Sequence, residues 1–185
     1  MMTLKQYQRI LTILDNDNLD DYHKKLSCVA IISGISFEEV LKLKQEYVNH
    51  IFDKVTQVHE QVKTAPIKNH ITIGNLTFKM VHDFNECTAG QLIEVLNYDL
   101  NDFANINRNM QNILATLSFK CLFLKWYPES YNANDHKWRA EQFLNANIVD
   151  VMGYIGFFLG FSEILHKSLK DVLQREMRNR TMDRE

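Results

Sequence analysis

The sequence is poor in the residues that break helices. Its 185 residues include only two prolines and six glycines. Because these two residues are the least favourable inside a helix, long stretches of the chain are free to form one. Hydrophobic residues make up 45% of the chain and charged residues 24%, which excludes the collagen-like, disordered and purely coiled-coil classes. We therefore expect a compact, mainly α protein of one domain.

Cysteine is scarce and forms no recognisable pattern. Cys28, Cys87 and Cys121 are far apart and lack CxxC spacing. This spacing excludes a secreted disulfide framework and a zinc site built from cysteine pairs, and it indicates a reducing compartment. The seven histidines show neither HxxxH nor HExxH spacing. We therefore expect no metal and no cofactor.

No stretch is long and apolar enough to predict a transmembrane helix. The most apolar stretch, residues 148–161, is shorter than the roughly 20 residues that span a bilayer, and it contains Asp150. The N-terminal residues lack a cleavage site, so we expect no signal peptide. A formal charge of −2 gives no net field that would attract nucleic acid or an anionic membrane. Only the arginines of the C-terminal tail leave a contact with DNA open.

Capping signals divide the first third of the chain into helices. Thr3 with Gln6, and Ser36 with Glu39, match the capping box that begins a helix. Apolar residues follow each box at helical spacing, and Gly34 is the residue type expected where a helix stops. The expected helices cover residues 4–14, from after Asp17 or Asn18 to Gly34, and from 37 toward Val62.

A β-hairpin is expected at about residues 70–81. Apolar and polar residues alternate there on both sides of Gly74 and Asn75, a pair suited to a two-residue turn. A third capping box follows at Thr88 and Gln91, with Cys87 placed to pack against the new helix. The hairpin is the one β element that the pattern predicts.

The rest of the chain is predicted to be helical. One helix runs from Phe103 through Leu117 and can extend to Trp126; a polar loop and a short helix from Trp138 to Leu144 follow. Pro66 and Pro128 punctuate the chain, but no linker separates its parts. We expect a single-domain helical bundle over residues 1–185, made of 1–65 (N-terminal helices), 67–127 (hairpin plus helices) and 129–185 (C-terminal helices).

A long C-terminal helix is expected from Asn147 to about Asn179. Its apolar residues form one broad face that we expect to pack on the core. Gly153, Gly156 and Gly160 fall within an arc of roughly 60° on nearly the opposite side. Each glycine costs about 1 kcal/mol of helix propensity, so close approach of another backbone is the expected compensation. That backbone belongs either to this chain or to another subunit.

The sequence carries none of the motifs that we associate with catalysis. A P-loop, GxGxxG, a GxSxG elbow and a cysteine-enzyme signature are all absent. Acidic pairs such as Asp20–Asp21 and Glu38–Glu39 lie at expected helix N-termini, where the backbone dipole accounts for them. We expect a protein that is not an enzyme.

Aromatic residues are in surplus for a core of this size. They cluster at Phe119 to Tyr127 and at Phe157 to Phe161, and such residues are enriched at protein interfaces. Together with the glycine arc, they predict a surface that binds other proteins. The candidate partner-binding residues are Trp126, Tyr127, Gly153, Gly156, Phe157, Gly160 and Ile164.

Three stretches, taken in order, resemble a family of phage proteins. They are residues 26–43 (LSCVAIISGISFEEVLKL), residues 71–78 (ITIGNLTF) leading into 83–94 (DFNECTAGQLIE), and Ile113-Leu-Ala with Tyr127-Pro-Glu-Ser-Tyr131. In this order they are similar to small helical morphogenesis proteins of tailed bacteriophages, the tail-assembly-chaperone-like group and its relatives among crAss-like phages. The similarity covers roughly residues 20–165. Its most distinctive piece is the Thr-Ala-Gly-Gln cap after the hairpin, although Cys87 replaces the usual leucine before it.

The resemblance implies a role in virion assembly without catalysis. It favours a structural component of the portal, neck or tail region, a head-tail connector for example, repeated as a homo-oligomer in a ring-like assembly. Its partners are then other phage structural or tail proteins, and its location is the virion, assembled in the host cytoplasm. Two alternatives stay open: a transient tail-assembly chaperone that the virion does not retain, and a host-directed inhibitor that binds a bacterial protein.

Overall fold

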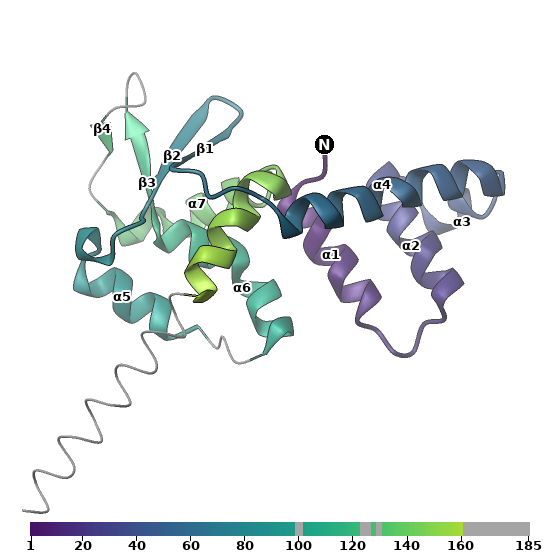
Figure 1. Ribbon diagram of the computed structural model, residues 1–185, viewed down its shortest axis with the longest axis horizontal. Helices are drawn as coiled ribbons and strands as arrows, with labels where there is room; N and C mark the ends of the chain where they lie inside the picture. The colour runs from purple at the N-terminus through teal and green to yellow at the C-terminus, as the bar shows by residue number, and fades with distance from the viewer. Residues whose placement is uncertain (99–101, 123–126, 129–130, 161–185) are drawn as a thin grey trace, which may run out of the picture.

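The computed structural model describes residues 1–98, 102–122, 127–128 and 131–160. The protein is mainly helical and carries a small antiparallel sheet, which confirms the helical class predicted from the sequence. Figure 1 shows the sheet at one end of the molecule and an arm of N-terminal helices at the other. None of the described helices is both long and apolar enough to span a membrane. The single domain over 1–185 stays a prediction, because 161–185 lie outside the described residues.

Helix α1 (Leu4–Leu14) begins at the expected capping box. The Gln6 amide N–H donates to Thr3 Oγ1 at 3.2 Å, and the Thr3 amide N–H donates to Gln6 Oε1 at 3.0 Å. The helix buries one face, as the spacing of its apolar residues predicted. The buried side chains on this face are Leu4, Tyr7, Ile10 and Leu11.

Helix α2 (Asp21–Ser33) begins slightly later than predicted. Asp20, rather than Asp17 or Asn18, is its N-cap, and the Asp20 carboxylate accepts a hydrogen bond from the His23 amide at 2.8 Å. A carboxylate also suits the positive end of the helix dipole. The helix ends as predicted at Gly34, which has a φ of 68° that favours glycine.

The prediction of one continuous helix from residue 37 toward Val62 is wrong. The Ser36–Glu39 capping box forms, but it begins only the short helix α3 (Phe37–Val40). The chain then turns, and α4 (Gln45–Lys63) begins after Lys44. Both helices contact α2, and Val40 shares a buried cluster with Val48. The turn allows the apolar faces of both α3 and α4 to pack against α2. Helical periodicity alone does not predict this packing.

The sheet consists of antiparallel strands in the order β1-β2-β3-β4. The predicted hairpin is confirmed: β1 (His70–Ile73) pairs with β2 (Leu76–Met80), and Gly74 opens the turn with a φ of 57°. β3 (Ser118–Leu122) pairs with β2, and the two-residue β4 (Tyr127–Pro128) pairs with β3.

The expected extension of a helix from Phe103 to Trp126 is wrong. Helix α6 (Phe103–Thr116) ends before Leu117, and the next five residues form β3. In this strand Ser118 is fully buried, whereas Phe119, on the other face of the strand, is half-buried. The strand also pairs with the open edge of β2, and a free edge is costly to leave unpaired. Pairing across 40 residues of sequence overrides the local helical pattern.

The remaining helical elements lie at the end of the molecule that carries the sheet (Figure 1). The third capping box is confirmed, since the Gln91 amide donates to Thr88 Oγ1 at 3.2 Å. Cys87 packs half-buried against the main core, as predicted. The elements are η1 (Phe84–Glu86), α5 (Ala89–Leu96), η2 (Ala133–Asp135) and α7 (His136–Phe143).

A final helix begins next to the N-terminus of the chain. It starts at Ile148 and is described to residue 160, so the predicted extension to Asn179 lies outside the described residues. The Asn147 side chain accepts from the Val149 amide at 3.3 Å, which supports the predicted start. The Ile148 amide donates to Met2 O at 3.0 Å, and the Leu4 amide donates to Ala146 O at 2.9 Å. The first residues of the chain are thereby bonded to the start of the last described helix.

Buried residues form a large core and a small one. The large core joins α1, the sheet, α6, α7 and the final helix; Phe78 and Phe143 lie at its centre with ring centroids 4.9 Å apart. The small core lies between α2, α3 and α4 and contains Leu26, Val29, Val40, Val48 and Ile51. We call residues 21–63, which hold the small core, the helical arm.

Candidate protein-binding surfaces

The three glycines of the final helix have different surroundings. A Cβ atom at Gly153 would overlap the carbonyl groups of Ala65 and Pro66, so the backbone of this chain passes directly over it. The predicted close approach is therefore confirmed at Gly153, and the contacting backbone belongs to this chain. Gly156 and Gly160 are exposed, and a Cβ atom at either position would meet no described atom within 4 Å. The described residues supply no close neighbour that compensates for these two glycines.

The other predicted partner-binding residues do not form one described surface. Phe157 is half-buried beside His82, with ring centroids 5.6 Å apart, and it also contacts Tyr154 at 5.8 Å. Tyr127 lies in β4, opposite Leu122. Trp126 and Ile164 lie outside the described residues.

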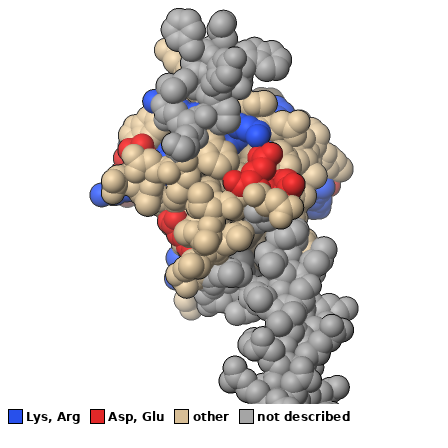
Figure 2. All heavy atoms as spheres, turned by 90° about the vertical axis from the view of Figure 1, so that its left-hand side faces the viewer, with Lys and Arg blue, Asp and Glu red and all other residues tan. Residues whose placement is uncertain are grey.

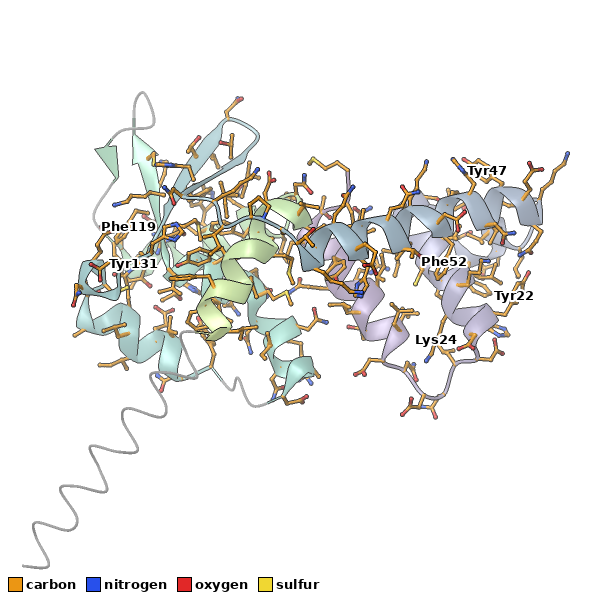
Figure 3. All side chains as sticks on the ribbon, viewed as in Figure 1. Tyr22, Lys24, Tyr47, Phe52, Phe119 and Tyr131 are labelled. Atoms are coloured by element: carbon orange, nitrogen blue, oxygen red, sulfur yellow. The ribbon has the colours of Figure 1, made fainter. Side chains whose placement is uncertain are left out.

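The helical arm exposes apolar side chains that the sequence did not single out as partner-binding. Tyr22 is 52% exposed, Leu41 59% and Tyr47 55%. Figure 3 places Tyr22 and Tyr47 at the end of the arm farthest from the sheet. The Tyr22 hydroxyl donates to Gln45 Oε1 at 3.1 Å, which connects α2 to the start of α4. Helical periodicity could not identify these positions, because the exposure of these side chains depends on how α2, α3 and α4 pack against one another.

A cluster of polar side chains connects α5, α6 and α7. Glu94 accepts a hydrogen bond from the Tyr131 hydroxyl at 2.5 Å and faces His136 Nε2 at 3.4 Å. His136 Nε2 is also 3.2 Å from Asn112 O and 3.1 Å from Thr116 Oγ1. The carbonyl can only accept a hydrogen bond, so this nitrogen is best placed as the donor. Burial and the neighbouring Glu94 carboxylate raise the pKa of Tyr131.

This cluster connects α5, α6 and α7 through side-chain hydrogen bonds. Five hollows of the described surface are lined by other residues, and Glu94, Tyr131 and His136 line none of these five. A general acid or base must reach the atom that it protonates, within hydrogen-bond distance or through one water. We therefore interpret the cluster as a polar cross-link between helices.

The cysteines are held as thiols. Burial raises the pKa of Cys28 to about 11, and burial together with nearby carboxylates raises the pKa of Cys87 to about 11. Because the thiolate is the nucleophile and the metal ligand, neither side chain is activated for such chemistry near neutral pH. In the part of the chain that the structure describes, no group of three or more His, Cys, Asp or Glu side chains could hold a metal ion.

Charges of both signs lie close together on the end of the molecule that carries the sheet. Figure 2 shows acidic and basic side chains next to one another on this face. Lys79 of β2 pairs with Glu86 at 3.0 Å, and elsewhere Lys68 pairs with Asp150 at 2.6 Å. Such surface pairs contribute little to stability, about 0–1 kcal/mol each.

Comparison with known proteins assigns no family to the chain, since no family model, curated protein or solved structure matches it.

Proposed function

We propose that this protein is a non-enzymatic structural or assembly protein of a tailed bacteriophage, which acts by binding other proteins. In this proposal it belongs to the portal, neck or tail region of the virion and is one copy in a repeated, ring-like assembly. The resemblance of the sequence to phage morphogenesis proteins supports the phage setting. The exposed apolar end of the helical arm supports the mode of action and is the observation that carries it.

The exposed apolar surface of the arm is large enough to contribute substantially to the free energy of binding. Tyr22, Leu41 and Tyr47 each leave more than half of their surface in contact with water. Burying apolar surface stabilises a complex by about 25 cal/mol per Å², so covering these three side chains contributes several kcal/mol, on the order of 5. Tyrosine is also enriched among the residues that dominate binding energy at protein interfaces. An arm that ends in such side chains is suited to a partner protein with an apolar groove.

The proposal predicts that the chain is retained in purified phage particles. Mass spectrometry of particles purified by density gradient should detect it at a constant ratio to the portal protein. The double variant Tyr22→Ser and Tyr47→Ser should lower its incorporation at least several-fold, because the apolar contact is lost. A matched control is Ile93→Ser, which removes an apolar side chain that is 62% exposed on α5, away from the arm.

The result also separates the alternatives. A chain absent from particles but bound to unassembled tail proteins in infected cells would be a transient tail-assembly chaperone. A chain absent from particles and bound to a bacterial protein would be a host-directed inhibitor. Equal incorporation of the arm variant and the Ile93→Ser control would contradict a role for the arm.

A further inference from the structure

A hollow of about 460 Å³ lies between α1, α2 and the start of α3. Five apolar side chains line it: Ile13, Ala30, Ile31, Ile35 and Phe37. Ile31 is buried, and the other four keep part of their surface exposed to solvent. Sites that hold a bound group are typically about 300–1,000 Å³ in volume and mostly apolar in lining. The hollow therefore has the room and the apolar surface to accept an aromatic side chain of a partner.

Arg9 of α1 adds a positive charge to this hollow. Among the described residues that line the hollow, Arg9 alone is charged. It is exposed, and it takes part in none of the ion pairs or cation–π contacts between described residues. Arginine presents a planar fork of donors that matches the two oxygens of a carboxylate. The hollow is therefore suited to an aromatic side chain that has a carboxylate beside it.

The far end of the helical arm carries this combination at Tyr47 of α4. Tyr47 is 55% exposed and directly follows Glu46 in the first turn of the helix. Glu46, Asp53 and Lys44 line the surface around it, and two carboxylates with one ammonium give a formal charge of −1. The neighbouring His50 is counted as neutral. None of the three charged side chains forms an ion pair with a described residue. We call Glu46, Tyr47 and Asp53 the arm tip.

The arm tip and the hollow lie on different parts of the molecule. Tyr47 is at the end of the arm farthest from the sheet (Figure 3), whereas the hollow includes α1, whose buried residues belong to the large core. A surface that binds a different surface of an identical copy makes a heterologous contact. Repetition of such a contact builds rings or filaments, so one chain can carry both halves of a repeated interface.

We propose that the arm tip of one copy docks in the hollow of a second copy of this chain. The ring of Tyr47 packs against the apolar lining, and the Glu46 carboxylate pairs with the Arg9 guanidinium. The opposite charges of the two surfaces, −1 and +1, favour this occupant. The inference rests on the proposed function for the binding role of the arm, and it names the partner of the arm. One contact of this kind is small, so we expect a dissociation constant on the order of 100 μM.

Sedimentation equilibrium of the full-length protein tests whether the copies associate. We expect the average mass to rise with concentration and to exceed two copies, because every contact leaves a free hollow at one end and a free arm tip at the other. The double variant Tyr22→Ser and Tyr47→Ser should weaken association at least about tenfold, whereas Ile93→Ser on α5 should leave it unchanged. An average mass that stays at one copy, or that stops at two, would overturn the inference.

A mixing experiment tests the head-to-tail geometry. The hollow variant Arg9→Glu and Ser27→Gln reverses the charge of the hollow and fills part of it, at two positions that are not fully buried. This variant keeps an intact arm tip, and the tyrosine double variant keeps an intact hollow. Each variant alone should stay monomeric, and an equimolar mixture should form pairs that grow no further. A mixture that stays monomeric would contradict the proposed contact.

Charge reversal tests the pairing of Glu46 with Arg9 without filling the hollow. Both residues are exposed, so the substitutions should leave the fold intact. Arg9→Glu or Glu46→Arg alone should weaken self-association about three- to tenfold, because attraction becomes repulsion. The two substitutions combined in one chain should restore most of the loss. A combined variant that associates as weakly as the single variants would refute this pairing.

Self-association and retention in phage particles are independent measurements, so they separate this inference from the proposed function. Association of copies whose chain is absent from particles would refute the virion role and leave the contact between copies established. Retention in particles by a chain that stays monomeric at every concentration would support the virion role, assign the arm to a different protein and refute the contact between copies.

Discussion

Gly153 and Gly156 look equivalent in the sequence but differ in their surroundings. Both lie in the interior of the final helix, where glycine costs about 0.5–1 kcal/mol relative to alanine. At Gly153 the missing Cβ makes room for the carbonyl groups of Ala65 and Pro66, whereas the space above Gly156 is open. Among the described residues, the same amino acid is therefore required at Gly153 and merely tolerated at Gly156.

We predict opposite effects for the same substitution at these two glycines. Gly156→Ala should raise the free energy of unfolding by about 0.5–1 kcal/mol, because it restores helix propensity without a clash. Gly153→Ala should lower it by about 1–3 kcal/mol, because the new methyl group displaces the backbone of residues 65–66. Urea unfolding followed by circular dichroism measures both. Stabilisation by both substitutions would mean that the loop at Pro66 moves away from the helix without cost.

At the scale of elements, the three capping boxes show what local sequence can and cannot determine. All three were predicted from residue type and spacing alone, and all three form. Their tertiary roles differ, however. Gln91 is fully buried and also donates through Nε2 to Thr116 O at 2.7 Å, which connects α5 to the end of α6. Glu39 in the corresponding position of α3 is exposed and reaches only Ser36.

Gln91→Ala should therefore destabilise the protein much more than Glu39→Ala. The first substitution leaves the buried Thr116 carbonyl without its donor, at a cost of about 1–3 kcal/mol in addition to the lost cap. The second removes one exposed hydrogen bond and should cost clearly less. Thermal unfolding of the two variants beside the wild type provides the comparison. Similar melting temperatures for both would show that the Gln91–Thr116 bond contributes nothing net.

The wrong predictions about the fold involve contacts between residues that are far apart in the sequence. Ser118 to Leu122 continued a helical pattern, but these residues became β3 because β2 offers an edge to pair with. The break between α3 and α4 follows in the same way from the α2 surface that both helices cover. Hairpin and caps were predictable because their determinants lie within a few residues of one another.

The candidate site was less predictable than the fold for a related reason. Gly153 was identified through its spacing, yet its partner Pro66 is 87 residues away and could not be named. Tyr22 and Tyr47 are separated by 25 residues and are exposed only because of how the helical arm folds. Away from these surfaces, Arg139 of α7 is buried, yet this short helix is mostly polar in sequence, so nothing local distinguishes a buried arginine from a solvated one.

At the scale of the whole molecule, the two cores imply two levels of stability. The small core of the helical arm has few members. The buried residues that connect the arm to the large core are Cys28, Ile31 and Val55, with Ile32, Phe52, Val58 and Val62 partly buried against the same core. Small clusters open more readily than large ones, and interaction surfaces are often drawn from the less stable parts of a protein. The arm that carries Tyr22 and Tyr47 can then adjust to a partner while the sheet and α6 stay folded.

This division predicts that the same substitution accelerates hydrogen exchange in fewer elements when it is made in the small core than when it is made in the large core. Val48 is 2% exposed in the small core and Val151 is fully buried in the large one, so Val→Ala costs about 2 kcal/mol at each. Hydrogen exchange measured by mass spectrometry should show Val48→Ala accelerating exchange in α3 and α4 but not in β2 or α6. Val151→Ala should accelerate it in all four elements, because opening the large core exposes the whole chain. If Val48→Ala also accelerated exchange in β2 and α6 to the same degree, the two cores would unfold as one unit and the arm would have no independent mobility with which to fit a partner.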